Sequence, residues 1–330
     1  NSHLDDMPGF WNLKTDEELP KMGISLGTKM NPVYAKYIIS MINQGKTKGE
    51  VTDLDLVNTT CNNACEYCSV KHRDKSQHYT LPTPEQVKPI IDRYNIRSCN
   101  YIGGECLTEW PAMQDLCNYF ETTNVHKLSI FTNGKLLSKD KLDYFSSLNK
   151  MVEIYIPVAT TTDPIIGHYD IDTFYSRYTD FLNYPKIKFT INLIVGHETF
   201  DVDYLIKKLG EVIGPNENFS LVINSMLDKL DEKQLASQLE NFEKMALSPY
   251  LDTIVLSDDR PEYIGTACSG FNISACSGGY STCSMATLDK NITPYKSIEE
   301  VNEIVDRQIK NSCGPCTAFN DADKCADNIL

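Results

Sequence analysis

Strand-like and helix-like segments alternate six times between residues 53 and 246 of this chain. Runs rich in β-branched and aromatic residues mark the strands, and amphipathic stretches opened by capping residues mark the helices. This alternation predicts a parallel sheet with helical crossovers, either doubly wound or curled towards a barrel. The expected strands are 53–58, 98–102, 127–132, 152–158, 187–195 and 219–223, and the expected helices are 84–94, 109–122, 138–147, 171–184, 202–213 and 232–246.

The composition is typical of a globular protein in water. Of 330 residues, 41% are hydrophobic and 23% are charged. No apolar run approaches the roughly 18 residues that a membrane-spanning helix needs. The first segment, 1–20, is polar and acidic, so we expect no signal peptide and a cytoplasmic protein. The net charge of −14 disfavours a nucleic acid as partner, because phosphate binding usually needs a basic face.

Twelve cysteines raise the question of disulfide bonds. Disulfide scaffolds are typically short secreted chains, whereas this chain is long enough to bury a large core. Four glycosylation sequons begin at Asn58, Asn218, Asn272 and Asn291, but Asn58 lies close to the first clustered cysteine, an awkward place for a glycan. Metal-binding thiols in a reducing compartment are therefore the better interpretation.

Three cysteines, Cys61, Cys65 and Cys68, directly follow the first expected strand. Their spacing also suits one face of a helix, but the intervening Asn and Thr residues are poor helix formers. Structural zinc sites and iron–sulfur clusters normally take four protein ligands. Three thiols on one loop would leave a coordination position open to a substrate or cofactor, as catalytic metal sites require.

Two further motifs follow the next two expected strands. Gly103-Gly104-Glu105 stands after the second strand, and Thr132-Asn133-Gly134 after the third. Together with the C-x3-C-x2-C spacing of the cysteines, they resemble the radical S-adenosylmethionine (SAM) enzyme superfamily. The resemblance implies a partial (β/α)6 TIM-like barrel with its site at the carboxyl ends of the strands. We expect an N-terminal extension at 1–50, the barrel at 51–250 and an appendage at 251–330.

The resemblance also implies a ligand set. Cys61, Cys65 and Cys68 would bind a [4Fe–4S] cluster whose open iron is chelated by the amino and carboxylate groups of SAM. Residues implied to contact SAM are Tyr67, Gly103, Gly104, Glu105, Thr132, Asn133 and Asn192. One departure from the family is visible after the fourth strand, where 157–164 reads PVATTTDP instead of a serine-containing run. The contacts to the SAM carboxylate are therefore not predicted.

The C-terminal segment carries six more cysteines. After a possible strand at 251–259, a hairpin is expected around the Gly-Gly turn that follows Cys276, and a helix at 297–310. The pattern of Cys268, Gly278 and Cys283 with a later C-x2-C pair resembles the twitch and SPASM appendages of radical SAM enzymes. This implies one auxiliary [4Fe–4S] cluster, with a structural zinc ion as the alternative. Its ligands would be Cys268, Cys283, Cys313 and Cys316, leaving Cys276 and Cys325 over.

The remaining cysteines have simpler interpretations. Cys99 and Cys117 are expected in the core, because buried free cysteine is common. Cys106 is next to Glu105, and we predict it as a candidate catalytic thiol that returns a hydrogen atom to a substrate radical. Core packing is the alternative for Cys106.

The resemblance implies an activity. Reductive cleavage of SAM would give a 5′-deoxyadenosyl radical that removes a hydrogen atom from a substrate, with flavodoxin or ferredoxin as the electron donor. We expect a peptide or protein substrate that is epimerised, crosslinked or oxidised. The alternative is dehydrogenation or rearrangement of a small molecule, nucleoside or modified nucleic-acid base. A non-catalytic electron carrier or zinc-binding module would not explain the Gly-Gly-Glu segment.

Overall fold

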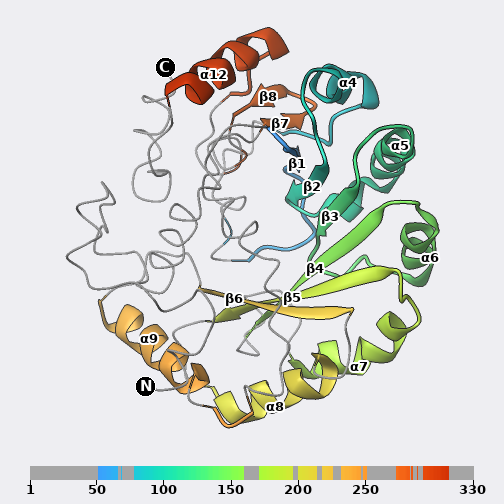
Figure 1. Ribbon diagram of the computed structural model, residues 1–330. Helices are drawn as coiled ribbons and strands as arrows, with labels where there is room; N and C mark the ends of the chain where they lie inside the picture. The colour runs from blue at the N-terminus through green and yellow to red at the C-terminus, as the bar shows by residue number, and fades with distance from the viewer. Residues whose placement is uncertain are drawn as a thin grey trace.

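The computed structural model is an α/β fold built around one curved sheet, with helices along its outer side (Figure 1). It describes residues 51–65, 68, 78–159, 171–195, 200–213, 218–225, 232–246, 248–250, 273–282, 284, 288 and 293–311. Among these, no helix is both long enough and apolar enough to cross a lipid bilayer.

Six consecutive parallel strands form most of the sheet, in the order β6-β5-β4-β3-β2-β1. The alternating pattern of the sequence predicted all six, and their bounds are confirmed to within two residues at each end. The strands are β1 Asp53–Asn58, β2 Ser98–Gly103, β3 Lys127–Phe131, β4 Met151–Ala159, β5 Ile187–Val195 and β6 Phe219–Ser225. A parallel sheet that keeps strict sequence order is the arrangement a partial barrel requires.

A helix follows each of these strands, as predicted. The helices are α4 Pro84–Arg93, α5 Trp110–Glu121, α6 Lys139–Ser147, α7 Ile171–Leu182, α8 Val202–Ile213 and α9 Glu232–Ala246. A short 3₁₀ turn, η2 Cys106–Glu109, precedes α5. Thr83 caps α4, because Thr83 and Gln86 form a reciprocal capping box. Ser138 is the N-cap residue of α6, but its hydroxyl bonds Asp140 instead of capping the backbone.

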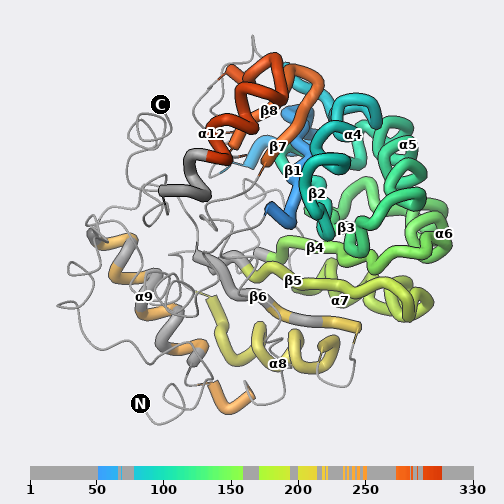
Figure 2. The backbone as a smooth tube through the Cα atoms, turned by 45° about the horizontal axis from the view of Figure 1, so that its top comes forward, coloured from blue at the N-terminus to red at the C-terminus, as the bar shows by residue number. Residues whose placement is uncertain are grey.

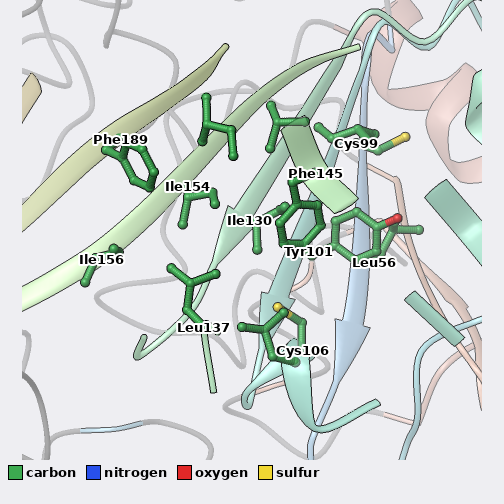
Figure 3. Packing of buried hydrophobic residues seen from close by; sticks show 14 of the residues in the cluster. Leu56, Cys99, Tyr101, Cys106, Ile130, Leu137, Phe145, Ile154, Ile156 and Phe189 are labelled. Carbon is green, nitrogen blue, oxygen red and sulfur yellow. The ribbon is translucent and has the colours of Figure 1, made fainter. Parts of the chain in front are cut away.

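The main core lies between the sheet and these helices. Neighbouring strands align one row of buried apolar side chains in register, and Phe145 of α6 packs against this row (Figure 3). The row runs across five strands through Leu56, Tyr101, Ile130, Ile154 and Phe189. Because side chains alternate between the two faces of a strand, the residues next in sequence must face away from the helices.

That second face of the sheet is polar near the amino ends of the strands. Asp55, Asn100, Ser129 and Glu153 are aligned in register across β1 to β4. Asn100 Nδ2 donates to Asp55 Oδ1 at 2.9 Å, and Lys127 Nζ pairs with Glu153 at 2.7 Å. These partners offset the cost of burying the polar groups.

One row nearer the carboxyl ends, this face becomes aromatic. The rings of Phe131 and Tyr155 stack with their centroids 4.2 Å apart. They separate the polar row below from the loops at the carboxyl ends of the strands.

A C-terminal hairpin extends the sheet beyond β1. Its strands are β7 Ile273–Cys276 and β8 Gly279–Ser281, and β7 pairs in parallel with β1. The sequence predicted this hairpin and the helix after it, here α12 Ile298–Asn311, as parts of a separate appendage. The structure instead joins the hairpin to the barrel sheet, since backbone pairing with β1 is available at that edge.

Helix α12 packs beside the start of the barrel. Figure 2 shows α12 near α4. Tyr94 at the end of α4 donates to Asn302 of α12 at 2.6 Å, and Arg93 pairs with Asp306 at 2.9 Å. The domain boundaries at 50 and 250 stay predictions, and the possible strand at 251–259 lies outside the described residues.

Candidate metal and cofactor site

The three sequence motifs meet at the carboxyl edge of β1, β2 and β3. These strands are adjacent and parallel, and Asn58 at the end of β1 is paired with Gly103 at the end of β2. The loops that follow them therefore share one edge of the sheet, as the sequence predicted.

The two glycines of the second motif contact the chain that leads to the cysteines. A Cβ atom on Gly103 would lie 2.1 Å from the Asn58 carbonyl oxygen, and one on Gly104 would lie 2.0 Å from the Thr60 carbonyl oxygen. Gly103 also has a φ angle of +115°, which side chains disfavour. The family resemblance implies that these glycines contact SAM. The structure gives a nearer reason, because the backbone of the cysteine loop already occupies that space.

Glu105 joins the second motif to the third. Its side chain is fully buried, and Oε1 accepts from Thr132 Oγ1 at 2.7 Å and from Leu107 N at 3.1 Å. Its Oε2 accepts from Asn133 N at 2.7 Å. Burial raises the pKa of Glu105, and the hydrogen bonds partly oppose that rise by favouring the carboxylate. A contact between Glu105 and the ammonium of SAM stays a prediction.

The third motif, in turn, holds the cysteine loop. Asn133 Nδ2 donates to Asn62 Oδ1 at 2.7 Å, and Lys135 Nζ donates to Asn63 Oδ1 at 2.6 Å. Asn62 and Asn63 are the residues that directly follow Cys61. Hydrogen bonds therefore run from the loop after β2, through the loop after β3, to the segment between the first two cysteines.

The three cysteines of this loop carry reduced thiols. Cys61 is exposed, Cys65 is buried and Cys68 is half-buried. Burial, together with charge repulsion from the neighbouring Cys68 and Cys61, raises the pKa of the Cys65 thiol to about 11. The peptide N–H of Asn63 donates to Cys61 Sγ at 3.4 Å.

This donor set suits a cationic metal centre. Thiols that repel one another as thiolates gain from an iron cluster, which binds them deprotonated and compensates their charge. Among the described residues, no three metal-binding side chains converge into a preformed group. The match between residues and cluster therefore rests on the three neighbouring thiols of one loop.

The structure describes some of the other predicted site residues but not all of them. Thr132 is buried at the end of β3, and Asn192 is half-buried on β5, paired in register with Pro157 of β4. The remaining predicted ligands and contacts lie outside the described residues: Tyr67, Cys268, Cys283, Cys313 and Cys316.

Cys106 lies in the main core rather than on an open surface (Figure 3). Its side chain is 1% exposed, its Sγ donates to the Phe131 carbonyl at 3.5 Å, and burial raises the pKa of its thiol well above the ordinary value. This placement favours core packing, and a catalytic role for Cys106 stays a prediction. Cys99 and Cys117 are fully buried, which confirms the prediction for them.

Several residues that shape this site were not predicted from the sequence. Asn62, Asn63 and Lys135 link the loops, and Asn58 Nδ2 donates to Glu109 Oε1 at 3.1 Å. Each of these contacts joins residues more than 50 positions apart, so no local sequence pattern reports it. The one available signal was position, because Asn58 and Lys135 adjoin motifs at strand ends.

Part of the chain is similar to a known family and to solved structures. Residues 56–209 match the Radical SAM superfamily. No curated protein matches the chain in sequence. Among solved structures, Streptococcus suis SuiB bound to S-adenosylmethionine is 14% identical with a TM-score of 0.52, covering 86% of this chain and 72% of SuiB. Native anSMEcpe with bound AdoMet is 16% identical with a TM-score of 0.50, covering 72% of this chain and 76% of that protein.

A match of this extent agrees with the geometry of the site. The family match spans β1 to most of α8 and includes all three motifs. The likeness to SuiB and anSMEcpe shows a shared fold. The match over residues 56–209, just under half of the chain, supports an enzyme with a radical SAM domain, and that superfamily implies a [4Fe–4S] cluster and reductive cleavage of SAM.

Proposed function

We propose that Cys61, Cys65 and Cys68 hold the [4Fe–4S] cluster and that SAM binds beside it, against the loops after β2 and β3. The observation that supports this best is the continuous set of hydrogen bonds from Glu105 through Asn133 to Asn62. Such a set fixes three loops relative to one another before any ligand arrives, which reduces the cost of ordering them on binding.

The proposal gives each site residue a specific role. The cluster and SAM supply, when bound, the 5′-deoxyadenosyl radical that takes a hydrogen atom from the substrate. Gly103, Gly104 and Glu105 receive the amino group of SAM, where a buried carboxylate favours a cation. The other proposed SAM contacts are Thr132, Asn133, Asn192 and, near the adenine, Tyr67.

The proposed substrate is a peptide or protein. SuiB, which has a similar fold, has also been crystallised bound to its precursor peptide SuiA; that structure is 15% identical to this chain with a TM-score of 0.49, covering 84% of this chain and 72% of SuiB. The acidic net charge of −14 favours a neutral or basic substrate over a nucleic acid. A small molecule or nucleoside is the second candidate for the same chemistry, with flavodoxin or ferredoxin as electron donor in both cases.

Isotope transfer distinguishes the two substrate classes. Hydrogen abstraction moves a substrate hydrogen to 5′-deoxyadenosine, so a deuterated substrate leaves deuterium in that product. We would incubate the reduced enzyme and SAM with extract from bacteria grown in D2O, with or without prior protease digestion and dialysis. If 5′-deoxyadenosine gains deuterium from the untreated extract but not from the protease-digested extract, the substrate is a peptide. If 5′-deoxyadenosine still gains deuterium from the protease-digested extract but not from the dialysed extract, the substrate is a small molecule.

A matched control excludes background labelling. The variant with Cys61, Cys65 and Cys68 changed to Ala should release no labelled 5′-deoxyadenosine from either fraction. Labelled product from this variant would contradict the assignment of the three thiols to the cluster.

We further propose one auxiliary [4Fe–4S] cluster held by Cys268, Cys283, Cys313 and Cys316. Support comes from the hairpin between the first two of these residues, since β7 is fixed against β1 beside the proposed catalytic cluster. Zinc content separates this proposal from a structural zinc site, because four thiolates bind either metal.

A further inference from the structure

Glu109 occupies an unusual position as the last residue of the 3₁₀ turn η2, directly before helix α5. It is the N-cap residue of α5, yet its side chain makes no capping hydrogen bond to that helix. Instead its two carboxylate oxygens reach the segment before and after the cysteines. Oε1 accepts from Asn58 Nδ2 at 3.1 Å, and Oε2 accepts from Leu81 N at 2.7 Å.

These two donors stand at the two ends of the β1–α4 connection (residues 59–83), which carries Cys61, Cys65 and Cys68. Asn58 is the last residue of β1, and Leu81 lies just before the N-cap of α4. The ends also meet directly, because Thr59 N donates to the Tyr79 carbonyl at 2.9 Å and Tyr79 N donates to Thr59 Oγ1 at 2.9 Å. One carboxylate therefore bridges the start and the end of the segment that holds the proposed cluster ligands.

The surroundings of Asn58 show how firmly this arrangement is fixed. Asn58 is fully buried, and its Nδ2 also donates to the carbonyls of Thr60 at 3.3 Å and Glu105 at 3.2 Å. Its Oδ1 is buried without a hydrogen-bond partner in the part of the chain that the structure describes. Turning the amide over would place that oxygen against three acceptors, so the donor must face Glu109.

A buried amide with an unsatisfied oxygen costs free energy, and a fold keeps it where the other contacts are worth more. Here those contacts set the separation of the two ends of the connection. A carboxylate suits this task because it only accepts hydrogen bonds, at both oxygens. A glutamine at this position could accept a hydrogen bond from one of these donors. Its amide nitrogen, which is itself a donor, would then face the other donor.

We infer that Glu109 is a positioning residue that closes the β1–α4 connection and so keeps Cys61, Cys65 and Cys68 at the separations one cluster needs. This inference rests on the proposed function for its consequence, but the bridging contacts stand without it. Glu109 acts through Asn58 and Leu81 and is not a proposed cluster ligand or SAM contact.

The test compares Glu109→Gln with Glu121→Gln as its matched control. Glu121 ends the same helix, and its carboxylate likewise accepts from a backbone amide and a side-chain amide, Asn149 N at 3.1 Å and Asn149 Nδ2 at 3.0 Å. It lies at the opposite end of α5 from the cysteine loop. Three quantities are measured: amide hydrogen exchange of the metal-free protein, the rate of iron loss to a ferrous chelator, and the electron paramagnetic resonance (EPR) spectrum of the reduced cluster with and without SAM.

In Glu109→Gln we expect the Leu81 amide to exchange about tenfold faster, the factor set by losing one charge-assisted hydrogen bond. Iron loss should also be about tenfold faster, since the ligands are no longer held at fixed separations. The EPR change that SAM induces should be smaller, while Glu121→Gln resembles wild type in all three. If Glu109→Gln does not fold, Glu109→Asp replaces it, because its shorter carboxylate keeps the charge but cannot span both donors.

The outcomes separate this inference from the proposed function. Normal iron uptake with unchanged exchange and unchanged iron loss in Glu109→Gln would overturn the inference alone. A wild-type protein that takes up no iron would overturn the proposed function and the inference with it, whatever the exchange rates. Equal effects in Glu109→Gln and Glu121→Gln would reduce Glu109 to general stabilisation and likewise overturn it.

Discussion

The two proposed cluster-binding regions differ in how the chain brings their cysteines together. Cys61, Cys65 and Cys68 are close in sequence, and the loops after β2 and β3 contact the segment that carries them. The four C-terminal cysteines span residues 268 to 316, and they lie outside the described residues. Cysteines on one loop after a strand are positioned by the sheet. Cysteines that are far apart in the sequence must instead be brought together by the metal or by further packing of the chain.

The hairpin between Cys268 and Cys283 connects these two regions. Its turn residue Ser277 donates to the Thr80 carbonyl at 2.9 Å, and Thr80 N donates back to Ser277 Oγ at 2.9 Å. Gly278 packs so closely on the Tyr79 ring that a Cβ atom would lie 2.3 Å away. The end of the cysteine loop thus rests against the C-terminal hairpin, and the following predictions test how unequal the two regions are.

The largest effect on stability is expected from Gly103→Ala. The new Cβ would meet a backbone oxygen at 2.1 Å, and the φ angle of +115° adds strain, so folding should lose about 3 kcal/mol or more. Gly278→Ala is the counterpart on the hairpin, where the ring of Tyr79 can move, and should cost about 1–2 kcal/mol. Denaturant unfolding of both variants measures the difference. Equal losses would contradict the stricter steric requirement for glycine at position 103.

The strands and motifs of this fold could be predicted from the sequence because their signals are local. The alternation of apolar segments located β1 to β6, and the three motifs were recognisable from their residue types and spacing. The role of Glu109 and the pairing of β7 with β1 could not be predicted in this way. Both depend on residues that meet only after the sheet has formed, and neither leaves a periodic or motif-like trace.

Glu105→Gln should act mainly on SAM and is the next largest effect. The change removes the buried negative charge and places an amide nitrogen near the donors that Glu105 now serves, so SAM affinity should fall at least about tenfold, roughly 1.4 kcal/mol. Iron content should stay at the wild-type level, because Glu105 is not a proposed ligand. Equilibrium binding of SAM, with iron assayed in the same samples, checks both statements. Equal affinity at equal iron content would remove Glu105 from the proposed SAM site.

A smaller effect is expected from Cys106→Ala, which tests whether the Cys106 thiol takes part in the radical reaction or only packs in the core. Cys106→Ala removes a buried sulfur from the core and should destabilise the protein by about 1–2 kcal/mol. The rate of 5′-deoxyadenosine release without substrate should be unchanged. Product yield from the deuterated peptide fraction then decides the catalytic prediction, since a hydrogen-returning thiol cannot be replaced by Ala. Full yield would leave Cys106 as a core residue only.

The smallest effect concerns Glu153, which lies towards the amino ends of the strands, away from the metal-site edge. Lys127 and Thr190 favour its carboxylate, so the pKa of Glu153 is lowered although burial opposes this. A lowered pKa contributes stability that is present above the ordinary value and is lost as pH falls through the folded-state value. Glu153→Gln should therefore lose about 1 kcal/mol at pH 7 and less below pH about 4. A pH-independent loss would show that the charge contributes nothing.

The most direct test of the account compares iron content and SAM cleavage in two cysteine variants after anaerobic reconstitution. Wild-type protein should hold about eight irons and eight sulfides per chain, from two four-iron clusters. Changing Cys61, Cys65 and Cys68 to Ala should leave about four irons and abolish 5′-deoxyadenosine release. Changing Cys268, Cys283, Cys313 and Cys316 to Ala should also leave about four irons, yet retain SAM cleavage. Wild-type rates of 5′-deoxyadenosine release from the first variant would contradict the central claim that the three thiols after β1 hold the catalytic cluster.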